Sequence, residues 1–408
     1  MEKLSCDVVI VGAGPGGSMA AKTCAKYGLD TVLVERKEDF KRAKFAQVLH
    51  RRIFDYIKID DRFVDAKIRG IKIISLDGTE LEMHEPKNFE LFFGIDRGRF
   101  DEELARLAEK NGAELMRASV AGLIKEDGKI KGVKTKTNEE ETEIRSNIVI
   151  EAGGIESKYR SFKEVDSCIE YLVESIDLDS EYIHYRIGVF ANSPFESFYL
   201  TPKGKDKFAI AFFSPNPNSA TEDRMDLFLK ENFPEAKVIE KNCGSIPLGS
   251  AGRELLTDGL MLVGDCAGCA SPLSRFGALF AMDSGVLAGE TAVEAHEEED
   301  FSSDLLARYG ERWRRLHGAR NDIEYEVRKF LMQRDLSGED VNSLFHILKD
   351  ENGVFTDAFF KKIVKGKGKG KGKGKGKGKR SKSDSDLERA LFKEFRRYDD
   401  NIWDLFVR

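Results

Sequence analysis

A glycine-rich segment near the N-terminus, Gly12-Ala13-Gly14-Pro15-Gly16-Gly17, has the residue types and spacing of a phosphate-binding turn. Gly12 allows a tight turn, Gly14 lets a pyrophosphate approach the backbone because it has no side chain, and Gly17 lets a helix lie close to a sheet. Glu35 follows about 20 residues later, where a carboxylate can accept hydrogen bonds from both hydroxyls of a ribose. The pattern therefore predicts a dinucleotide site that includes Gly12, Gly14, Pro15, Gly17 and Glu35.

The elements that must position these residues can be read from the neighbouring sequence. The apolar run 7–11 predicts a buried parallel strand, and the Ala-rich segment 18–27 predicts a helix that Gly28 ends. Residues 30–35 predict a second strand. Such a helix would offer the N–H groups and partial positive charge of its N-terminus to the phosphates.

A second turn of this kind, far along the chain, carries Gly264 and Asp265 after another apolar run. A helix-prone segment, 277–295, follows it. The turn resembles the second cofactor motif of the flavoprotein family that includes para-hydroxybenzoate hydroxylase and the geranylgeranyl reductases. The resemblance implies FAD as the cofactor, with Gly264 at the turn, Asp265 at the ribityl chain, and the backbone of Gly277 and Ala278 near flavin O2. A helix N-terminus there would stabilise negative charge on reduced flavin.

A third segment, 96–104, matches the Arg-x-x-Phe-Asp-x-x-Leu pattern of the same family. In the family this segment leads a helix back to the FAD-binding domain, so the resemblance places Arg97 near the cofactor. A surface salt bridge is the alternative interpretation for this arginine.

Two features favour one branch of the family. Aromatic hydroxylases usually have a His and a Pro-Pro run after the Gly-Asp pair, whereas this chain continues with residues 266–268 and then Ser271-Pro272. This looks more like the geranylgeranyl reductases and the electron-transfer flavoprotein:quinone oxidoreductases. Residues 194–202 also keep both prolines of the reductases' Pro-x-x-Tyr-x-Trp-x-Phe-Pro segment, with Tyr199 at one of its aromatic positions. By this resemblance Tyr199 is the candidate proton donor; a residue in the wall of the cavity is the alternative.

Three departures from the family pattern stand beside these matches. The cysteine that the reductases place after the second strand is absent from residues 44–47. The family's Ala-Asp-Gly-x-x-Ser-x-x-Arg segment appears as residues 152–160, with Gly153 in place of the acid. This loss weakens the case for direct use of NADPH. The third departure is Arg275, which enters the loop before Gly277 where the family has a glycine pair.

Arg275 is therefore a candidate for a role in the reaction. A guanidinium beside the flavin pyrimidine would stabilise negative charge on reduced flavin or hold an acidic substrate. The alternative is an arginine that points to solvent from its loop.

The cysteines predict thiol chemistry at one place only. Cys266 and Cys269 lie in the flavin loop and could form a redox pair, or they could be small residues that let the backbone meet the cofactor. No second Cys or His pair has the spacing of zinc ligands, so no metal site is predicted. The six cysteines are expected to be mostly reduced thiols.

Length and composition favour a globular protein of two domains, or one elaborate one. The net charge of −6 argues against a general nucleic-acid binder. No run of about 18 apolar residues predicts a membrane-spanning helix, and the first residues lack the features of a signal peptide. A cytoplasmic location is expected, with the inner face of the cell membrane as a peripheral alternative.

The predicted fold is α/β: a Rossmann-like FAD-binding domain with a parallel sheet, an inserted antiparallel-sheet substrate domain and a helical C-terminal region. A hairpin signal at Asp77-Gly78 and the aromatic segments 182–190, 198–201 and 208–213 predict the antiparallel sheet, which would wall an apolar cavity or fill a core. The predicted boundaries are 1–70, 95–165 and 245–300 for the FAD-binding domain, 71–94 and 166–244 for the substrate domain, and 301–364 for the helical region.

The C-terminal segment has a different composition. Residues 365–386 begin with an unbroken Lys-Gly alternation and predict a flexible cationic linker, and 387–408 predict a basic amphipathic helix. This combination would dock on an anionic membrane surface, or the helix would contact the protein's own body.

The function that fits these observations is hydride transfer from reduced FAD to a carbon–carbon double bond of an isoprenoid lipid. NADPH or a ferredoxin-type protein would be the electron donor. The alternatives are a flavin-dependent monooxygenase, or a membrane-associated electron-transfer flavoprotein that does not turn over a lipid.

Overall fold

The computed structural model describes residues 2–40, 47–58, 60–84, 90–137, 140–188, 195–216, 218, 220–250, 256–333 and 342. The chain forms two compact units. The first contains Met1–Asp65, Gly94–Asp166 and Gly244–Tyr325, and the second contains Ala66–Phe93, Ser167–Cys243 and the chain from Glu326 onward. Each unit has a hydrophobic core of its own.

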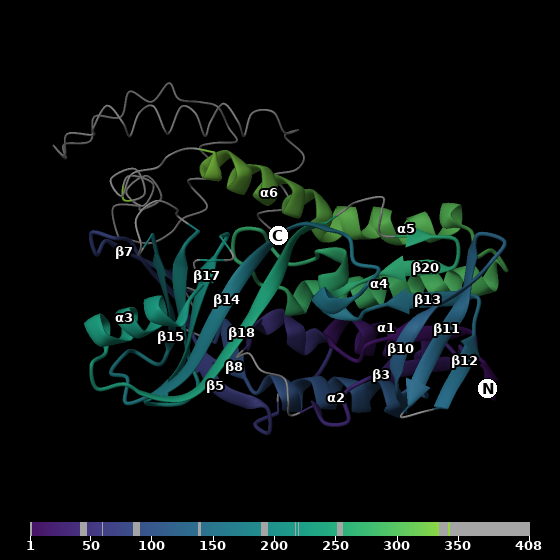
Figure 1. The fold of residues 1–408 in the computed structure, drawn as a ribbon, viewed down its shortest axis with the longest axis horizontal. Helices are drawn as coiled ribbons and strands as arrows, with labels where there is room; N and C mark the ends of the chain where they lie inside the picture. The colour runs from purple at the N-terminus through teal and green to yellow at the C-terminus, as the bar shows by residue number, and fades with distance from the viewer. Residues whose placement is uncertain are drawn as a thin grey trace. The chain divides into compact units, whose positions relative to one another are not determined.

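The first unit is built on a six-stranded sheet (Figure 1). The order is β19-β20-β13-β2-β3-β9, and every pair except β19–β20 is parallel. Strands β2, β3 and β13 are buried along their whole length, as expected for a parallel sheet covered on both faces. The strand bounds, in sheet order, are Leu256–Thr257, Leu260–Leu262, Ile148–Glu151, Val8–Val11, Thr31–Glu35 and Glu114–Arg117.

Helix α1 (Pro15–Lys26) contacts β2, β3 and β13, and it is flanked by α2 (Arg97–Lys110) and α4 (Ala278–Glu297). Glycines allow the close approach of α1 to α4. A Cβ atom built on Gly285 of α4 would lie 2.0 Å from the carbonyl oxygen of Gly16, so no side chain fits there. At Gly17, which the sequence predicts to let this helix lie close to the sheet, a Cβ atom would lie 1.8 Å from the carbonyl oxygen of Gly12 in the turn after β2.

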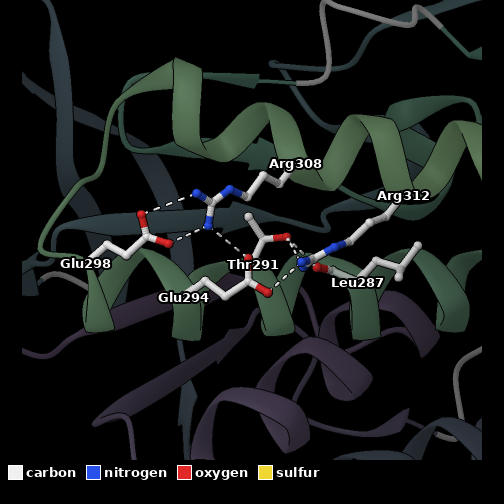
Figure 2. Close-up of polar contacts among 6 residues, drawn as sticks. All are labelled: Leu287, Thr291, Glu294, Glu298, Arg308 and Arg312. Carbon is white, nitrogen blue, oxygen red and sulfur yellow. Dashed lines mark hydrogen bonds and ion pairs between the residues drawn. The ribbon is translucent and has the colours of Figure 1, made fainter.

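Helix α5 (Ser303–Trp313) is joined to α4 by charged side chains (Figure 2). Arg308 contacts Glu298 at 2.5 Å and Glu294 at 3.4 Å, and Arg312 contacts Glu294 at 2.5 Å. Arg312 also donates to Thr291 Oγ1 at 3.2 Å. After α5 the chain forms a π-helical turn, Arg314–Gly318, and then α6, Ala319–Met332. In the predicted helical region 301–364, the residues from Ser303 to Met332 are thus helical, with a π turn between the two α-helices.

Two smaller sheets were not anticipated from the sequence. The order of the first is β1-β12-β11-β10, formed by Glu2–Ser5, Glu140–Arg145, Lys129–Thr137 and Ser119–Glu126, in which β1 pairs with β12 in parallel. The order of the second is β4-β8-β5, formed by Gln47–His50, Phe92–Ile95 and Val64–Ile68. A one-turn helix of the 3₁₀ type, Arg51–Asp55, follows β4.

The second unit carries most of a seven-stranded sheet of order β18-β14-β17-β16-β15-β6-β7. Strands β14 to β17 and β6 to β7 pair antiparallel, while β15 pairs with β6 in parallel. Phe198, Phe208 and Phe212 of β16 and β17 share a core with helix α3 (Glu222–Asn232), where Phe198 stacks on Phe228 at 3.8 Å between ring centroids. The strand bounds, in sheet order, are Lys237–Ser250, Phe162–Glu174, Lys207–Ser214, Ser197–Pro202, Tyr182–Ile187, Gly70–Ile74 and Glu80–His84.

These observations confirm the predicted α/β class, with a parallel sheet, a largely antiparallel sheet and helices toward the C-terminal end. The predicted linker 365–386, the amphipathic helix 387–408 and all of the helical region beyond 333 except residue 342 lie outside the described residues. So do residues 44–46 of the segment that lacks the family's cysteine. Among the helices that the structure describes, none is long and apolar enough to cross a membrane.

Candidate cofactor site

The glycine turn between β2 and α1 leaves room for a ligand. Gly12 has a φ of +93°, and a Cβ atom on it would lie 2.6 Å from the Ala152 carbonyl oxygen, so glycine is required there. In front of Gly14 the space is open, because no heavy atom lies within 4 Å of the place of a Cβ. Gly14 is also the N-cap of α1, with Pro15 in the first turn, no side-chain cap and no acidic residue. This end of the helix fits a phosphate group.

Glu35 lies at the end of β3, as predicted, and is 7% exposed. Its Oε2 atom accepts a hydrogen bond from the Ala13 N–H at 2.7 Å, and Oε1 accepts one from the Lys37 N–H at 2.8 Å. The carboxylate therefore holds the glycine turn as well as facing the ligand space.

A cavity of ≈ 320 Å³ opens at the carboxyl ends of β2, β3 and β13, all within the first unit. Its lining includes Gly12, Gly14, Glu35, Arg97 and Glu151. Ligands of open α/β sheets bind at this edge, so the cavity is where a dinucleotide would be expected.

Asp265 lies in the second turn, which follows β20. It is exposed, whereas its neighbours Gly264 and Cys266 are buried, so its carboxyl is open to a ligand. Gly264 has a φ of +67°, and its N–H donates to the Ser284 hydroxyl of α4 at 3.0 Å. The surrounding protein raises the pKa of Asp265 by desolvation, and the charge of Arg97 opposes this shift. The surroundings of the turn thus disfavour the charged form of this carboxyl.

The N-terminus of α4 lies beside this carboxyl. Gly277 is the N-cap of α4 and Ala278 is its first residue, and no acidic residue stands in the first turn. A Cβ atom on Gly277 would lie 3.5 Å from Asp265 Oδ1. The structure therefore brings Asp265, Gly277 and Ala278 together, as the family resemblance implies.

Arg97, the first residue of α2, connects the two turns electrostatically. Its Nε atom contacts Asp101 Oδ1 at 2.7 Å, and its side chain is 27% exposed. Burial raises the pKa of Asp101, while the charge and hydrogen bond of Arg97 lower it. The arginine also lines the cavity and is near enough to Asp265 for each charge to act on the pKa of the other. Arg97 and its partner Asp101 both line the cavity, and the contact of Arg97 with a cofactor stays a prediction.

Arg275 contacts a residue that the sequence did not indicate. Its Nε atom lies 2.7 Å from Asp166 Oδ2 at the first unit's end of β14, and the two side chains are 2% and 1% exposed. Its φ of +62° is unusual for a residue with a side chain. The alternative of an arginine in solvent is wrong, and its effect on a flavin stays a prediction.

The loop around Arg275 is held by α6. Ser271 donates from its hydroxyl to Glu324 Oε2 at 2.5 Å, and the Asn321 amide donates to the Cys269 carbonyl oxygen at 3.0 Å. Arg320 in turn contacts Glu324 at 2.7 Å. These buried hydrogen bonds fix the backbone that leads into α4, and none of the partners in α6 was singled out from the sequence.

Tyr199 lies in β16 of the second unit and is 8% exposed. Its ring stacks on Tyr185 at 4.1 Å between centroids and meets Phe213 edge-on at 5.3 Å. This packing fits a residue in the wall of an aromatic layer, and the role of proton donor stays a prediction.

Cys266 and Cys269 are both buried and carry free thiols. The Cys266 thiol donates to the Glu151 and Val263 carbonyl oxygens at 3.0 and 3.1 Å. Burial raises the pKa of Cys269 to about 12 and that of Cys266 well above its ordinary value. No group of three or more potential metal ligands occurs in the described part of the chain.

Glu151 is a site residue that sequence reasoning missed. It ends β13, is 3% exposed and lines the cavity beside the glycine turn. The sequence does carry a signal for Glu151. It is an acidic residue at the end of an otherwise apolar strand, directly before the segment that contains Gly153.

Residues 5–320 match the family described as "FAD binding domain". A digeranylgeranylglycerophospholipid reductase of Methanosarcina acetivorans is 34% identical over 367 residues, which cover 84% of this chain and 88% of that protein. A second such reductase, from Methanococcoides burtonii, is 33% identical and covers 88% and 91% of the two chains. The solved structure of a geranylgeranyl bacteriochlorophyll reductase-like protein from Thermoplasma acidophilum matches with a TM-score of 0.81 at 25% identity, covering 89% of this chain and 96% of that one.

Proposed function

Because the chain belongs to the geranylgeranyl reductase family of FAD-dependent oxidoreductases, we propose that it reduces carbon–carbon double bonds of an isoprenoid glycerophospholipid. The observation that carries this proposal is the 34% identity over 84% of the chain to a digeranylgeranylglycerophospholipid reductase. The cavity at the glycine turn and, in the second turn, the exposed residue Asp265 fit the same chemistry.

The residues of the two turns would hold FAD as follows. The backbone from Gly12 to Gly17 and the N-terminus of α1 would bind the pyrophosphate, and Glu35 would bind the adenosine ribose. Asp265 would bind the ribityl chain, and Gly277 with Ala278 would meet the pyrimidine part of the flavin by backbone. The positive charge of Arg97 would offset the negative charges of Asp101 and Asp265 next to the cofactor.

When bound, FAD would supply two-electron chemistry: after reduction by a donor, a hydride passes to one carbon of the double bond while a proton reaches its neighbour. The chain contributes charge stabilisation from the N-terminus of α4, a helix of 20 residues without an acid in its first turn. Arg275 would add positive charge to the same loop. Tyr199 would donate the proton, and the aromatic sheet around it would contact the isoprenoid chain.

The test uses purified holoprotein under anaerobic conditions. The flavin is reduced with dithionite, a geranylgeranyl phospholipid is added, and reoxidation is followed by visible absorption. We expect lipid-dependent reoxidation and, by mass spectrometry, a product with two more hydrogens for each double bond reduced. Flavin that reoxidises only with oxygen or a quinone would contradict the proposal and favour a monooxygenase or an electron carrier.

Two variants make the test specific. Asp265→Ala should weaken FAD binding about tenfold or more, since a hydrogen bond to a charged group contributes about 1.5–3 kcal/mol. Asp223→Asn removes an exposed carboxylate of α3 in the second unit and should leave FAD binding unchanged. NADPH and a reduced ferredoxin, each in place of dithionite, identify the class of electron donor.

A further inference from the structure

The carboxyl of Glu151 stands at the end of an apolar strand and lines the cofactor cavity. The other residues of β13 are apolar and fully buried, whereas Glu151 turns its side chain into the cofactor cavity. Its Oε1 atom accepts a hydrogen bond from the Gly153 N–H at 2.9 Å, and the Ser157 hydroxyl is a second partner. A buried carboxyl held by two donors beside a ligand cavity points to a binding role.

Gly153 is explained by Glu151 and not by the backbone. The φ of Gly153 is −71°, a value that any residue adopts, so its conformation does not require glycine. A Cβ atom on Gly153, however, would lie 2.5 Å from Glu151 Oε1, far inside contact distance. The carboxyl of residue 151 therefore occupies the space that a side chain on residue 153 would use.

We propose that Glu151 replaces the acid that the family's Ala-Asp-Gly segment carries where this chain has Gly153, and that its carboxyl contacts the bound FAD. The carboxyl lines the same cavity as Gly14 and Glu35. It would therefore contact the pyrophosphate or the adenosine ribose, the parts of FAD that these two residues would bind. The acid would thus come from two positions earlier in the chain, with its carboxyl 2.5 Å from the place of a Cβ atom on residue 153.

Burial acts on the charge of this carboxyl. It raises the pKa of Glu151, although the Gly153 N–H and the Ser157 hydroxyl lower it. The two partners, Gly153 and Ser157, both favour the ionised form of this buried carboxyl and so oppose the effect of burial. The inference rests on FAD binding by this site and not on the lipid substrate, so a negative lipid assay would leave it intact.

The experiment exchanges the two positions. The dissociation constant of FAD is measured for the wild type, Glu151→Ala, Gly153→Asp and the double variant, from the rise of flavin fluorescence on dilution of each holoprotein. Glu151→Ala should bind FAD about 2- to 12-fold more weakly, the effect of one net hydrogen bond. Gly153→Asp should also bind more weakly, because two carboxyls then compete for one place. The double variant should return to within about twofold of the wild type, since it has one carboxyl again.

A methyl group gives a second test that needs no new charge. Gly153→Ala should displace the Glu151 carboxyl and weaken FAD binding, but it should have no effect when Glu151 is already alanine. Thermal unfolding of each apoprotein serves as the folding control. The proposal is overturned if the effects of the paired substitutions multiply, if Glu151→Ala binds FAD like the wild type, or if only the apoprotein melting temperature changes.

Discussion

At the scale of single residues, Cys266 and Cys269 differ from Asp265 in environment, although all three lie in one loop. The Asp265 carboxyl is exposed, whereas both thiols are buried against backbone carbonyls or helix α4. Nucleophilic attack and disulfide exchange need the thiolate. Because burial raises the pKa of both cysteines, their environment favours the interpretation as small packing residues over a redox pair.

The prediction is a difference in alkylation. With iodoacetamide at pH 8, the exposed Cys243 should be labelled, while Cys266 and Cys269 should react only after unfolding. The reason is that the pKa of Cys269 is raised to about 12 and that of Cys266 well above its ordinary value, so both stay protonated below that range. Peptide mass spectrometry reads the labelled sites. Rapid labelling of either buried cysteine in the native protein would restore the redox interpretation.

At the scale of elements, the loop before α4 and strand β14 are joined by a buried ion pair. Arg275 and Asp166 are each almost fully buried, whereas the pairs between α4 and α5 in Figure 2 are partly exposed. Removing one partner of a buried pair leaves an uncompensated charge, but exposed pairs contribute little. The Arg275–Asp166 pair therefore links the backbone that leads into α4 to strand β14.

We expect Asp166→Ala to lower the free energy of unfolding by about 3–5 kcal/mol. The matched control is Arg308→Ala, which removes the partly exposed pairs with Glu294 and Glu298 and should cost about 1 kcal/mol or less. Denaturant unfolding of the holoproteins measures both values. Equal small losses in the two variants would show that the buried pair does not stabilise the loop.

The double variant Asp166→Ala/Arg275→Ala separates the effect of the pair on the free energy of unfolding from its effect on the reduction potential of the flavin. It should regain part of the lost stability, because no charge is left unpaired. If Arg275 stabilises negative charge on reduced flavin, the double variant should also have a more negative reduction potential than the wild type. An unchanged potential would limit Arg275 to a structural role.

At the scale of the whole molecule, the cofactor site lies within one unit, and the C-terminal tail lies outside the described residues. The lining residues of the cavity lie between Val11 and Tyr159, so deleting residues 365–408 removes none of them. A basic segment contributes about 1 kcal/mol for each Lys or Arg near an anionic membrane surface.

Deleting residues 365–408 should leave FAD bound and reduce binding to vesicles of anionic phospholipid at least about tenfold. Co-sedimentation of the full chain and the shortened chain measures this, with zwitterionic vesicles and high salt as controls for a charge effect. Vesicle binding that does not change on deletion would favour the alternative in which the tail contacts the protein itself.

The cofactor turns were predictable because their signals are local. Glycine spacing, apolar runs and a helix-prone segment fix the turn from β2 to α1 and the turn before α4 within a few residues. Glu35 could be placed at the end of β3 for the same reason. From these features, and from the family that the second turn resembles, the sequence alone determined an α/β fold that binds FAD.

Tertiary structure decided what depends on distant partners. Arg275 meets Asp166 across 109 positions of sequence, and β1 pairs with β12, so neither contact leaves a local pattern. From the sequence, Gly153 is interpreted as the loss of an acid. The sequence does not show that the Glu151 carboxyl lies where a side chain of residue 153 would be. The physical reason is the same in each case: the partner of a buried charge or a free strand edge is selected by packing in space, which residue spacing does not encode.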